Sequence, residues 1–222
     1  MWAIIPIKNV NEAKHRLDSI LNPTERRELF VAMFEDVLQT LMAVPELERV
    51  VVATVCPVAS EIARRNGASI LSTGEDKGQT AAVELAAKTL SADGIEGMLM
   101  LPGDVPLVTV EEIQTVLEVH GNAISVAPVM TIVAARDEQG SNCIALSPPT
   151  AASLRFGTNS YFPHLDNARK LGLTLNTPKL PGIGLDIDTP EDLQELCRQP
   201  VRSKVQKYLR TNNIMQRLKK HE

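Results

Sequence analysis

The chain has 222 residues, of which 44% are hydrophobic and 23% charged, and its formal net charge is −4. This composition is typical of a soluble globular domain with a full core, and no apolar run approaches the roughly 20 residues of a membrane-spanning helix. The N-terminus lacks the features of a signal peptide, and the three widely spaced cysteines show no metal-ligand spacing. We therefore expect a cytoplasmic protein whose cysteines are small core residues.

In chain order, the first half alternates between strand and helix signals. Four apolar segments predict strands at residues 2–7, 49–55, 69–71 and 97–101. Helices are predicted at residues 23–44, 57–66, 81–90 and 109–117, the first after an Asn22 cap and the last after a Thr109–Glu112 capping box. This alternation predicts an α/β fold with a mostly parallel sheet and right-handed crossovers.

The second half is less regular. Its predicted strands are residues 124–127 and 142–147, which bracket a polar loop at 135–141, and residues 173–180 are expected to be extended. A helix is predicted at 161–171, and a further helix is expected to begin near Thr189. No internal repeat or low-complexity linker interrupts the chain, so a single domain over residues 1–198 is the simplest organisation.

The basic residues are unevenly distributed. Residues 199–222 carry seven Lys or Arg and one acidic residue, whereas residues 1–198 carry 16 basic and 26 acidic side chains. An acidic body argues against general nucleic-acid binding. One face of the predicted tail helix is apolar: Val201, Val205, Tyr208 and Leu209. This pattern favours a docking helix or a subunit contact over a membrane or nucleic-acid arm, and a homodimer is the default oligomer.

Three carboxylates give the first chemical signal. Asp104 follows an apolar strand, at the edge where open parallel sheets bind their ligands. Asp186 and Asp188 are two residues apart on an extended segment, so their side chains point to the same face. Converging carboxylates suit Mg²⁺, which prefers oxygen ligands and bridges to phosphates. Alternatively, Asp104 closes a turn and Asp188 caps the next helix.

Cations follow the first strand. Lys8, Lys14 and Arg16 lie in the loop after residues 2–7, which suggests a polyanion site at the sheet edge, although a solvated face explains them equally well. Residues 140–142 (GSN) and 157–160 (GTNS) offer backbone N–H groups and hydroxyls that can bind phosphate or carboxylate, or form ordinary turns.

Other chemical signals are weak. The four histidines show no spacing for a metal or a catalytic triad, so we expect surface or capping roles: His15, His120, His164 and His221. No Walker A motif and no G-x-G-x-x-G sequence occurs, which argues against a P-loop or a dinucleotide-binding Rossmann site.

Together these segments resemble the guanylyltransferases of coenzyme F-420 biosynthesis, which act on 2-phospho-L-lactate or phosphoenolpyruvate. Residues 5–17 (IPIKNVNEAKHRL) are similar to the family's opening I-P-x-K and A-K-x-R-L signature. Four later segments resemble its remaining motifs in order: residues 101–106 (LPGDVP), 140–142 (GSN), 155–160 (RFGTNS) and 185–193 (LDIDTPEDL). The resemblance spans residues 1–198, and five ordered motifs are far more specific than one.

The resemblance implies a single-domain nucleotidyltransferase fold of the GT-A type and transfer of GMP from GTP to a phosphorylated acid, with release of diphosphate. The implied metal is Mg²⁺, held by Asp104, Asp186 and Asp188. The implied catalytic residues are Lys8, Lys14, Arg16 and Asp104. The implied GTP-binding residues are Lys8, Lys14, Arg16, Gly78, Gln79 and Thr80. The implied acid-binding residues are Ser141, Asn142, Gly157 and Ser160. The product is expected to pass to a transferase that acts on the deazaflavin.

This sequence departs from the family pattern at three places. Gln79-Thr80 follows Gly78 where Leu-Asn is frequent, Ser141 replaces Thr, and Thr158-Asn159 replaces a Pro-x pair. The acceptor therefore stays open between phosphoenolpyruvate, 2-phospho-L-lactate and 3-phospho-D-glycerate. Two other functions also remain: a nucleotidyltransferase for a sugar phosphate or a molybdopterin, whose relatives usually open with a Gly-rich loop absent here, and a silent nucleotide-binding module.

Overall fold

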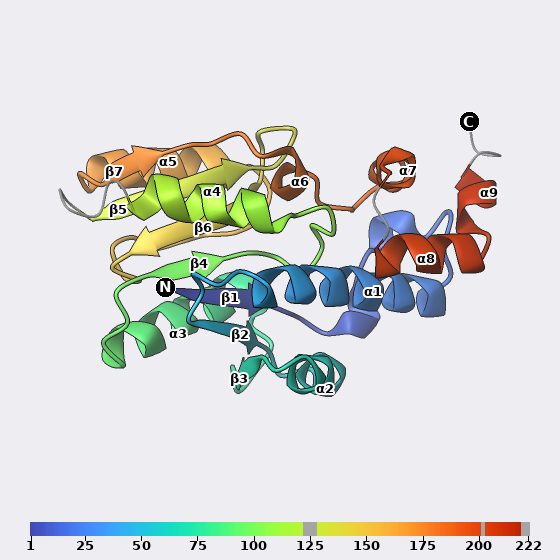
Figure 1. Ribbon diagram of the computed structural model, residues 1–222, viewed down its shortest axis with the longest axis horizontal. Helices are drawn as coiled ribbons and strands as arrows, with labels where there is room; N and C mark the ends of the chain where they lie inside the picture. The colour runs from blue at the N-terminus through green and yellow to red at the C-terminus, as the bar shows by residue number, and fades with distance from the viewer. Residues whose placement is uncertain (122–127, 201–202, 219–222) are drawn as a thin grey trace.

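One seven-stranded sheet, in the order β3-β2-β1-β4-β6-β5-β7, forms the centre of the protein (Figure 1). The computed structural model describes residues 1–121, 128–200 and 203–218. Its strands are β1 (Trp2–Pro6), β2 (Arg49–Ala53), β3 (Ser69–Leu71), β4 (Met98–Met100), β5 (Val129–Ala134), β6 (Ser141–Ser147) and β7 (Thr174–Asn176). Only β6 is antiparallel to its two neighbours within this described sheet, so the predicted mostly parallel α/β sheet is confirmed.

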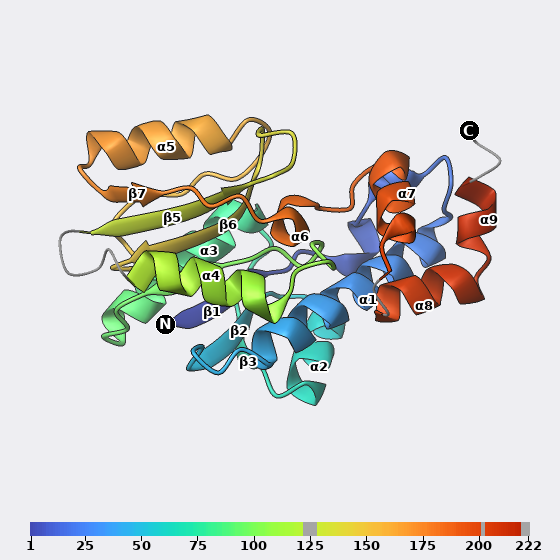
Figure 2. The same cartoon turned by 45° about the horizontal axis from the view of Figure 1, so that its top comes forward.

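Helices cover both faces of the sheet (Figure 2). The longer ones are α1 (Pro23–Met42), α2 (Pro57–Arg65), α3 (Gly78–Ala92), α4 (Val110–Gly121), α5 (Tyr161–Lys170), α7 (Pro190–Arg198) and α8 (Lys204–Thr211). The shorter ones are η1 (Val10–Glu12), η2 (His15–Leu17), α6 (Pro181–Gly184) and α9 (Ile214–Leu218). Alternation along β1 supplies both cores: Ile5 belongs to the core that α1, α2 and α4 cover, whereas Ile4 belongs to the core that α3 and α5 cover.

In the first half of the chain, local sequence signals correctly predicted the capping boxes that begin two helices. Asn22 and Glu25 form the predicted capping box of α1, and Thr109 and Glu112 exchange hydrogen bonds at the start of α4. Two helix boundaries were wrong by three or more residues: α3 begins three residues earlier than predicted, at Gly78, and α4 continues to Gly121. The sequence analysis also did not predict β5. This strand is buried over Val129–Val133, and a continuous apolar run without alternation gives no clear period. The strand predicted at 124–127 lies outside the described residues.

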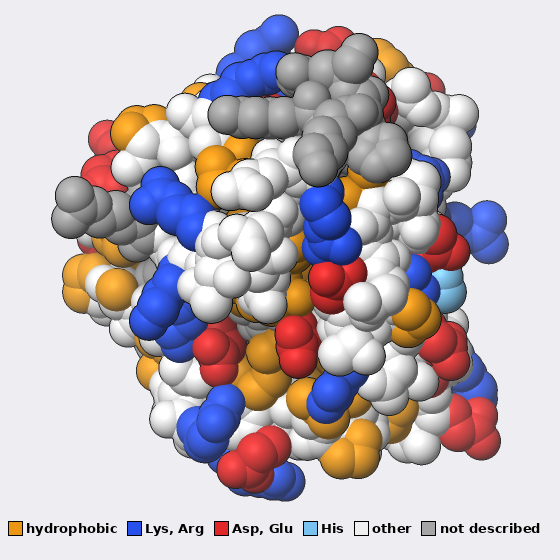
Figure 3. All heavy atoms as spheres, turned by 90° about the vertical axis from the view of Figure 1, so that its right-hand side faces the viewer, with side chains coloured by type: hydrophobic (Ala, Val, Ile, Leu, Met, Phe, Trp, Pro, Cys, Tyr) orange, Lys and Arg blue, Asp and Glu red, His pale blue; other side chains and the backbone are white. Residues whose placement is uncertain are grey.

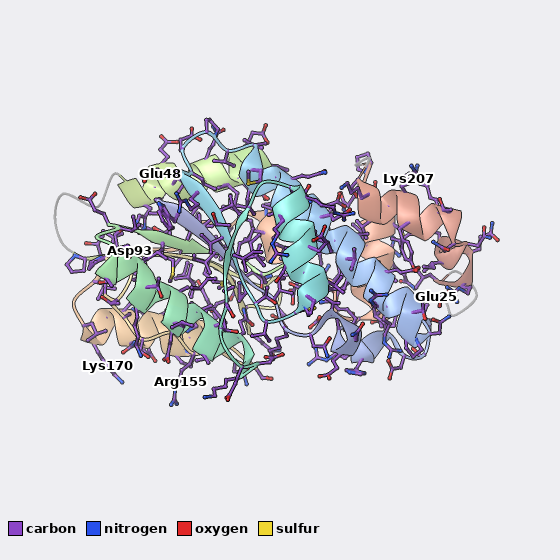
Figure 4. All side chains as sticks on the ribbon, turned by 90° about the horizontal axis from the view of Figure 1, so that it is seen from below. Glu25, Glu48, Asp93, Arg155, Lys170 and Lys207 are labelled. Atoms are coloured by element: carbon purple, nitrogen blue, oxygen red, sulfur yellow. The ribbon has the colours of Figure 1, made fainter. Side chains whose placement is uncertain are left out.

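The basic tail docks on the acidic side of α1, as predicted for a docking helix. Asp36 accepts hydrogen bonds from the backbone N–H groups of Lys204 and Val205, both at 2.9 Å, and thereby caps α8. Arg217 pairs with Glu25 at 2.7 Å. Figure 3 shows basic and acidic side chains interspersed on the α7–α9 end of the molecule. Glu25 lies below α8 in Figure 4, and Lys207 points outward from α8. The positive charge of the tail is thus partly neutralised by the body.

Other expectations were tested as well. Val205 and Leu209 are buried and Tyr208 is half-buried, whereas Val201 lies outside the described residues. Cys56 and Cys143 are buried free thiols, as expected, and Cys197 is partly exposed. No helix in the described part of the chain is long and apolar enough to cross a membrane.

Candidate active site

The predicted charged segments meet at one edge of the sheet. β1 and β4 are adjacent and parallel, so the loop after β1 and the turn after β4 leave the sheet side by side. The first carries Lys14 and the second carries Asp104. The backbone N–H of Ile187 donates to the carbonyl oxygen of Asp104 at 3.0 Å, which brings Asp186 and Asp188 to the same edge. This is the carboxyl end of the parallel strands, where such sheets bind ligands.

Lys14 is the central cation of this edge. Its Nζ lies 2.6 Å from Asp104 Oδ2 and 2.6 Å from Asp188 Oδ1, and its side chain is only 4% exposed. Lys14 also takes a left-handed φ of +61°, a conformation rare for a residue with a side chain. Arg16 Nη1 lies 3.7 Å from Asp188 Oδ2 and is largely exposed. The capping role considered for Asp188 is wrong, since Thr189 is the N-cap of α7.

Burial and neighbouring charges shift the pKa values of three groups in this site: Lys14, Asp186 and Asp188. Burial alone would lower the pKa of Lys14, but the carboxylates of Asp104 and Asp188 outweigh it and raise that pKa. Burial alone would raise the pKa of Asp188, but Lys14 and Arg16 hold it below its ordinary value. For Asp186, burial and the neighbouring charges of Asp104 and Asp188 raise the pKa. The three carboxylates are therefore close enough to repel one another.

The predicted magnesium ligands can be compared with this geometry. In the described part of the chain, no group of three or more His, Cys, Asp or Glu side chains is arranged as a ready-made metal site. Asp104 and Asp188 hold the Lys14 ammonium, and Asp186 Oδ1 accepts a hydrogen bond from Asn142 Nδ2 at 3.1 Å. The donor chemistry nevertheless fits Mg²⁺, which commonly takes one or two carboxylates and completes its shell with water and substrate phosphates. The three metal ligands stay a prediction.

Of the predicted nucleotide-binding residues, Lys8, Lys14 and Gln79 line one cleft, whereas Arg16 borders the second cleft described below. Lys8 is exposed and lies against Gly78: a Cβ placed on Gly78 would be 3.7 Å from Lys8 Cε. Gln79 lines the same cleft as Lys8, Lys14 and Asp104, with a volume of about 410 Å³. Thr80, which was also predicted to bind the nucleotide, is not among the residues that line this cleft. Its Oγ1 accepts a hydrogen bond from the backbone N–H of Phe156 at 3.0 Å.

The predicted acid-binding residues line a second, polar cleft of about 370 Å³ that shares Gln79, Asp104 and Asp188 with the first. Ser141, Asn142, Gly157 and Ser160 all border it. Gly157 has a φ of +140°, which glycine adopts readily and other residues rarely do. A larger groove of about 720 Å³ lies between α1, α2 and α8, but it is mostly apolar and contains none of the predicted site residues.

Comparison with known proteins identifies the family. Residues 1–221 match the family model described as guanylyl transferase CofC like. The chain belongs to the CofC family. A phosphoenolpyruvate guanylyltransferase from Sphaerobacter thermophilus is 33% identical over 197 residues, covering 88% of this chain and 91% of the relative. A 2-phospho-L-lactate guanylyltransferase from Methanothermobacter thermautotrophicus is 31% identical, covering 94% and 89%. A 3-phospho-D-glycerate guanylyltransferase from Colwellia psychrerythraea is 29% identical, covering 94% and 97%.

Solved structures confirm the fold of this CofC protein. A nucleotidyl transferase from Methanothermobacter thermautotrophicus aligns with a TM-score of 0.63 at 15% identity, covering 95% of this chain and 98% of that one. A CMP:2-keto-3-deoxy-manno-octonic acid synthetase complexed with CTP aligns with a TM-score of 0.60 at 15% identity, covering 88% and 95%. The predicted single-domain nucleotidyltransferase fold is therefore confirmed.

The expectation for two histidines was wrong. His120 and His164 are 0% and 3% exposed, so neither has a surface role. His120 lies between Thr131 Oγ1 at 3.0 Å and Ser147 Oγ at 2.9 Å, in the core beneath α4. His164 contacts Ser141 of the second cleft. His15 is exposed as expected, and His221 lies outside the described residues. The sequence signal for His164 was its place on the buried face of α5 with Leu165 and Ala168.

Proposed function

We propose that this CofC protein transfers GMP from GTP to the phosphate group of a small phosphorylated acid and releases diphosphate. The observation that carries the proposal is the Lys14 ammonium held between Asp104 and Asp188, where the cleft that Lys8 and Lys14 line meets the polar cleft. The relatives named above give three candidate acceptors: phosphoenolpyruvate, 2-phospho-L-lactate and 3-phospho-D-glycerate. In the coenzyme F-420 pathway that the family implies, a deazaflavin transferase would consume the product.

The reaction requires alignment and charge neutralisation more than covalent catalysis. A phosphate oxygen of the acid attacks the α-phosphorus of GTP. The bond from that phosphorus to the bridging oxygen breaks, and diphosphate leaves with the electron pair. The attacking phosphate is already ionised at neutral pH, so no general base is required.

On the nucleotide side, Lys8, Lys14 and Arg16 neutralise the triphosphate and the leaving diphosphate. Gly78 and Gln79 lie beside Lys8, and Gln79 contacts the nucleotide through its side-chain amide. The backbone N–H of Gly78 donates to Asp76 Oδ1 at 3.1 Å, so Gly78 contributes close backbone approach rather than a free donor. Mg²⁺ would be held by Asp104, Asp188 and Asp186, and when bound it supplies further charge neutralisation at the phosphates.

On the acceptor side, the second cleft binds the phosphorylated acid. The hydroxyl of Ser141 and the open backbone at Gly157 offer hydrogen bonds to its anionic oxygens, and Ser160, which borders the same cleft, donates its O–H to Ser141. Asn142 acts indirectly, because its side-chain amide donates to Asp186 and to the Ile183 carbonyl oxygen. An acid bound in this cleft would lie next to Asp104 and Asp188, as an in-line transfer requires.

The test is diphosphate release by the purified protein with GTP, Mg²⁺ and each of the three acids. We expect acid-dependent release with at least one of them, and no release with any would refute the proposal. Asp104→Asn should lower kcat at least about 100-fold while the protein stays folded. Asp93→Asn is the matched control, because Asp93 is exposed at the C-terminal end of α3, whereas Gly78 and Gln79 of the proposed site lie at the N-terminal end of that helix (Figure 4). Equal activity of the two variants would remove Asp104 from the reaction centre.

A further inference from the structure

A buried hydrogen-bond network supports one wall of the acid cleft. Ser141 Oγ lies 2.9 Å from His164 Nδ1, and Ser160 Oγ donates to Ser141 Oγ at 3.4 Å. Ser141, Ser160 and His164 are each less than a tenth exposed. Ser141 and Ser160 border the cleft, whereas His164 lies behind them on α5 and is not among the residues that line it.

The protonation of His164 follows from its second contact. The backbone N–H of Arg155 donates to His164 Nε2 at 2.9 Å, so this nitrogen is a hydrogen-bond acceptor. The Arg155 side chain points away from the protein body, and only its backbone takes part (Figure 4). Burial lowers the pKa of His164 to about 4, which keeps the ring neutral at pH 7. A neutral imidazole with an accepting Nε2 carries its proton on Nδ1, and Nδ1–H therefore donates to Ser141.

The direction of this bond decides what Ser141 can offer to a ligand. Its oxygen accepts from His164 and from Ser160, which occupies both lone pairs of a hydroxyl. The remaining group is the O–H hydrogen, which is free to donate into the cleft. A fixed donor selects an anionic oxygen, and hydrogen bonds to charged groups are stronger than neutral ones.

We propose that His164 is a positioning residue that orients the Ser141 hydroxyl as a donor to an anionic oxygen of the phosphorylated acid. The inference rests on the proposed function, in which the second cleft binds the acid. Phe156, which borders the same cleft, packs edge-on against the His164 ring with centroids 5.4 Å apart. His164 therefore holds two cleft residues from the side away from the cleft: it hydrogen-bonds to Ser141 and packs against Phe156.

Two substitutions separate the two nitrogens of His164. In His164→Asn, the side-chain amide can occupy the position of Nδ1 and still donate to Ser141, but the contact to Arg155 is lost. In His164→Gln, the longer amide can reach the position of Nε2 and accept from Arg155, but the donor to Ser141 is lost. We expect the KM for the acid to rise about tenfold or more in the Gln variant and at most about threefold in the Asn variant. The KM for GTP should stay within about twofold in both.

A double-mutant cycle tests whether His164 acts through Ser141. Ser141→Ala alone should raise the acid KM, and adding His164→Gln to it should produce little further increase, because the shared interaction is already lost. His120→Gln is the matched control for burial and folding. His120 is also a buried histidine between two partners, but it lies outside the acid cleft. It should lower the urea midpoint without changing the acid KM.

The outcomes are distinct. If the wild-type protein releases no diphosphate with any acid, the proposed function fails. If the wild type is active, three results would each overturn the role of His164: an unchanged acid KM in His164→Gln, equal acid KM values in the Gln and Asn variants, or additive effects of His164→Gln and Ser141→Ala. A positioning role should raise the KM for the acid and leave the KM for GTP unchanged. A general loss of stability should instead lower the apparent kcat, because part of the preparation is unfolded, without a selective change in either KM.

Discussion

Replacing Lys14 with Met removes the ammonium that Asp104 and Asp188 both contact at 2.6 Å. Methionine has an unbranched side chain of similar length and the same difficulty with a left-handed φ, so the backbone cost largely cancels. Removing one partner from a buried ion pair typically costs about 3–5 kcal/mol. Asp104 and Asp188 remain 23% and 39% exposed, and water screens part of this loss. We expect the free energy of unfolding to fall by about 2 kcal/mol at neutral pH.

The pH dependence of this difference follows from the pKa shifts. The carboxylates raise the pKa of Lys14 above its ordinary 10.5, so its stabilisation is complete below pH 10.5 and is lost as the pH rises through the folded-state pKa. Lys14 and Arg16 hold the pKa of Asp188 below its ordinary 3.8 despite burial, so that stabilisation is complete above pH 3.8 and is lost as the pH falls further. The difference between wild type and variant should therefore be constant between these limits and shrink outside them.

Urea unfolding followed by circular dichroism over a pH series measures this difference. Lys8→Met is the matched control, because Lys8 is exposed and forms no ion pair with any residue that the structure describes. Its unfolding free energy should stay within about 0.5 kcal/mol of wild type. The reasoning would be refuted by equal stability of Lys14→Met and Lys8→Met, or by a Lys14→Met difference that does not shrink at low pH.

Three further predictions concern the acid side and the buried histidines. Thr80→Val removes the acceptor of the Phe156 N–H; urea unfolding should show a loss of about 1–2 kcal/mol, and the acid KM should rise several-fold in the diphosphate assay. Gly157→Ala should cost about 1–3 kcal/mol in the same unfolding assay through backbone strain alone, since a Cβ there meets no atom within 4 Å. Burial lowers the pKa of His120 and His164 from 6.5 to about 4, so the unfolded state binds more protons between these values and stability is lost as the pH falls below 6.5. The loss should be about 1.4 kcal/mol per pH unit for each histidine, and His120→Gln should show the shallower slope of one histidine in urea titrations at several pH values.

The sequence predicted which charged groups meet, because that follows from topology. Lys14 lies in the loop after β1 and Asp104 in the turn after β4, and parallel strands that lie side by side bring the following loops to one edge. The sequence could not predict that the Lys14 ammonium would lie between Asp104 and Asp188. That contact depends on a left-handed backbone at Lys14 and on the Ile187–Asp104 backbone hydrogen bond, and neither leaves a periodic signal.

The histidine prediction failed for a different physical reason. A histidine is intermediate in polarity, and its burial depends on whether both ring nitrogens find partners. The partners of His164 are Ser141, 23 residues away, and the backbone of Arg155, 9 residues away. Contacts at such separations cannot be read from spacing within α5. The only local signal was the helical face shared with Leu165 and Ala168, which favoured burial over a capping role.

The loop after β1 joins the two halves of the proposed site. At one end, the Asn9 backbone N–H donates to Asp76 Oδ2 at 3.3 Å, in the loop that leads into α3. At the other end, Lys14 contacts Asp104 and Asp188. A left-handed φ costs a residue such as Lys14 about 1–3 kcal/mol unless its surroundings hold it, and the two ion pairs are the contacts able to offset that cost. The spacing between the nucleotide loop and the carboxylates is therefore set by one short segment, and a change at either end should be transmitted to the other.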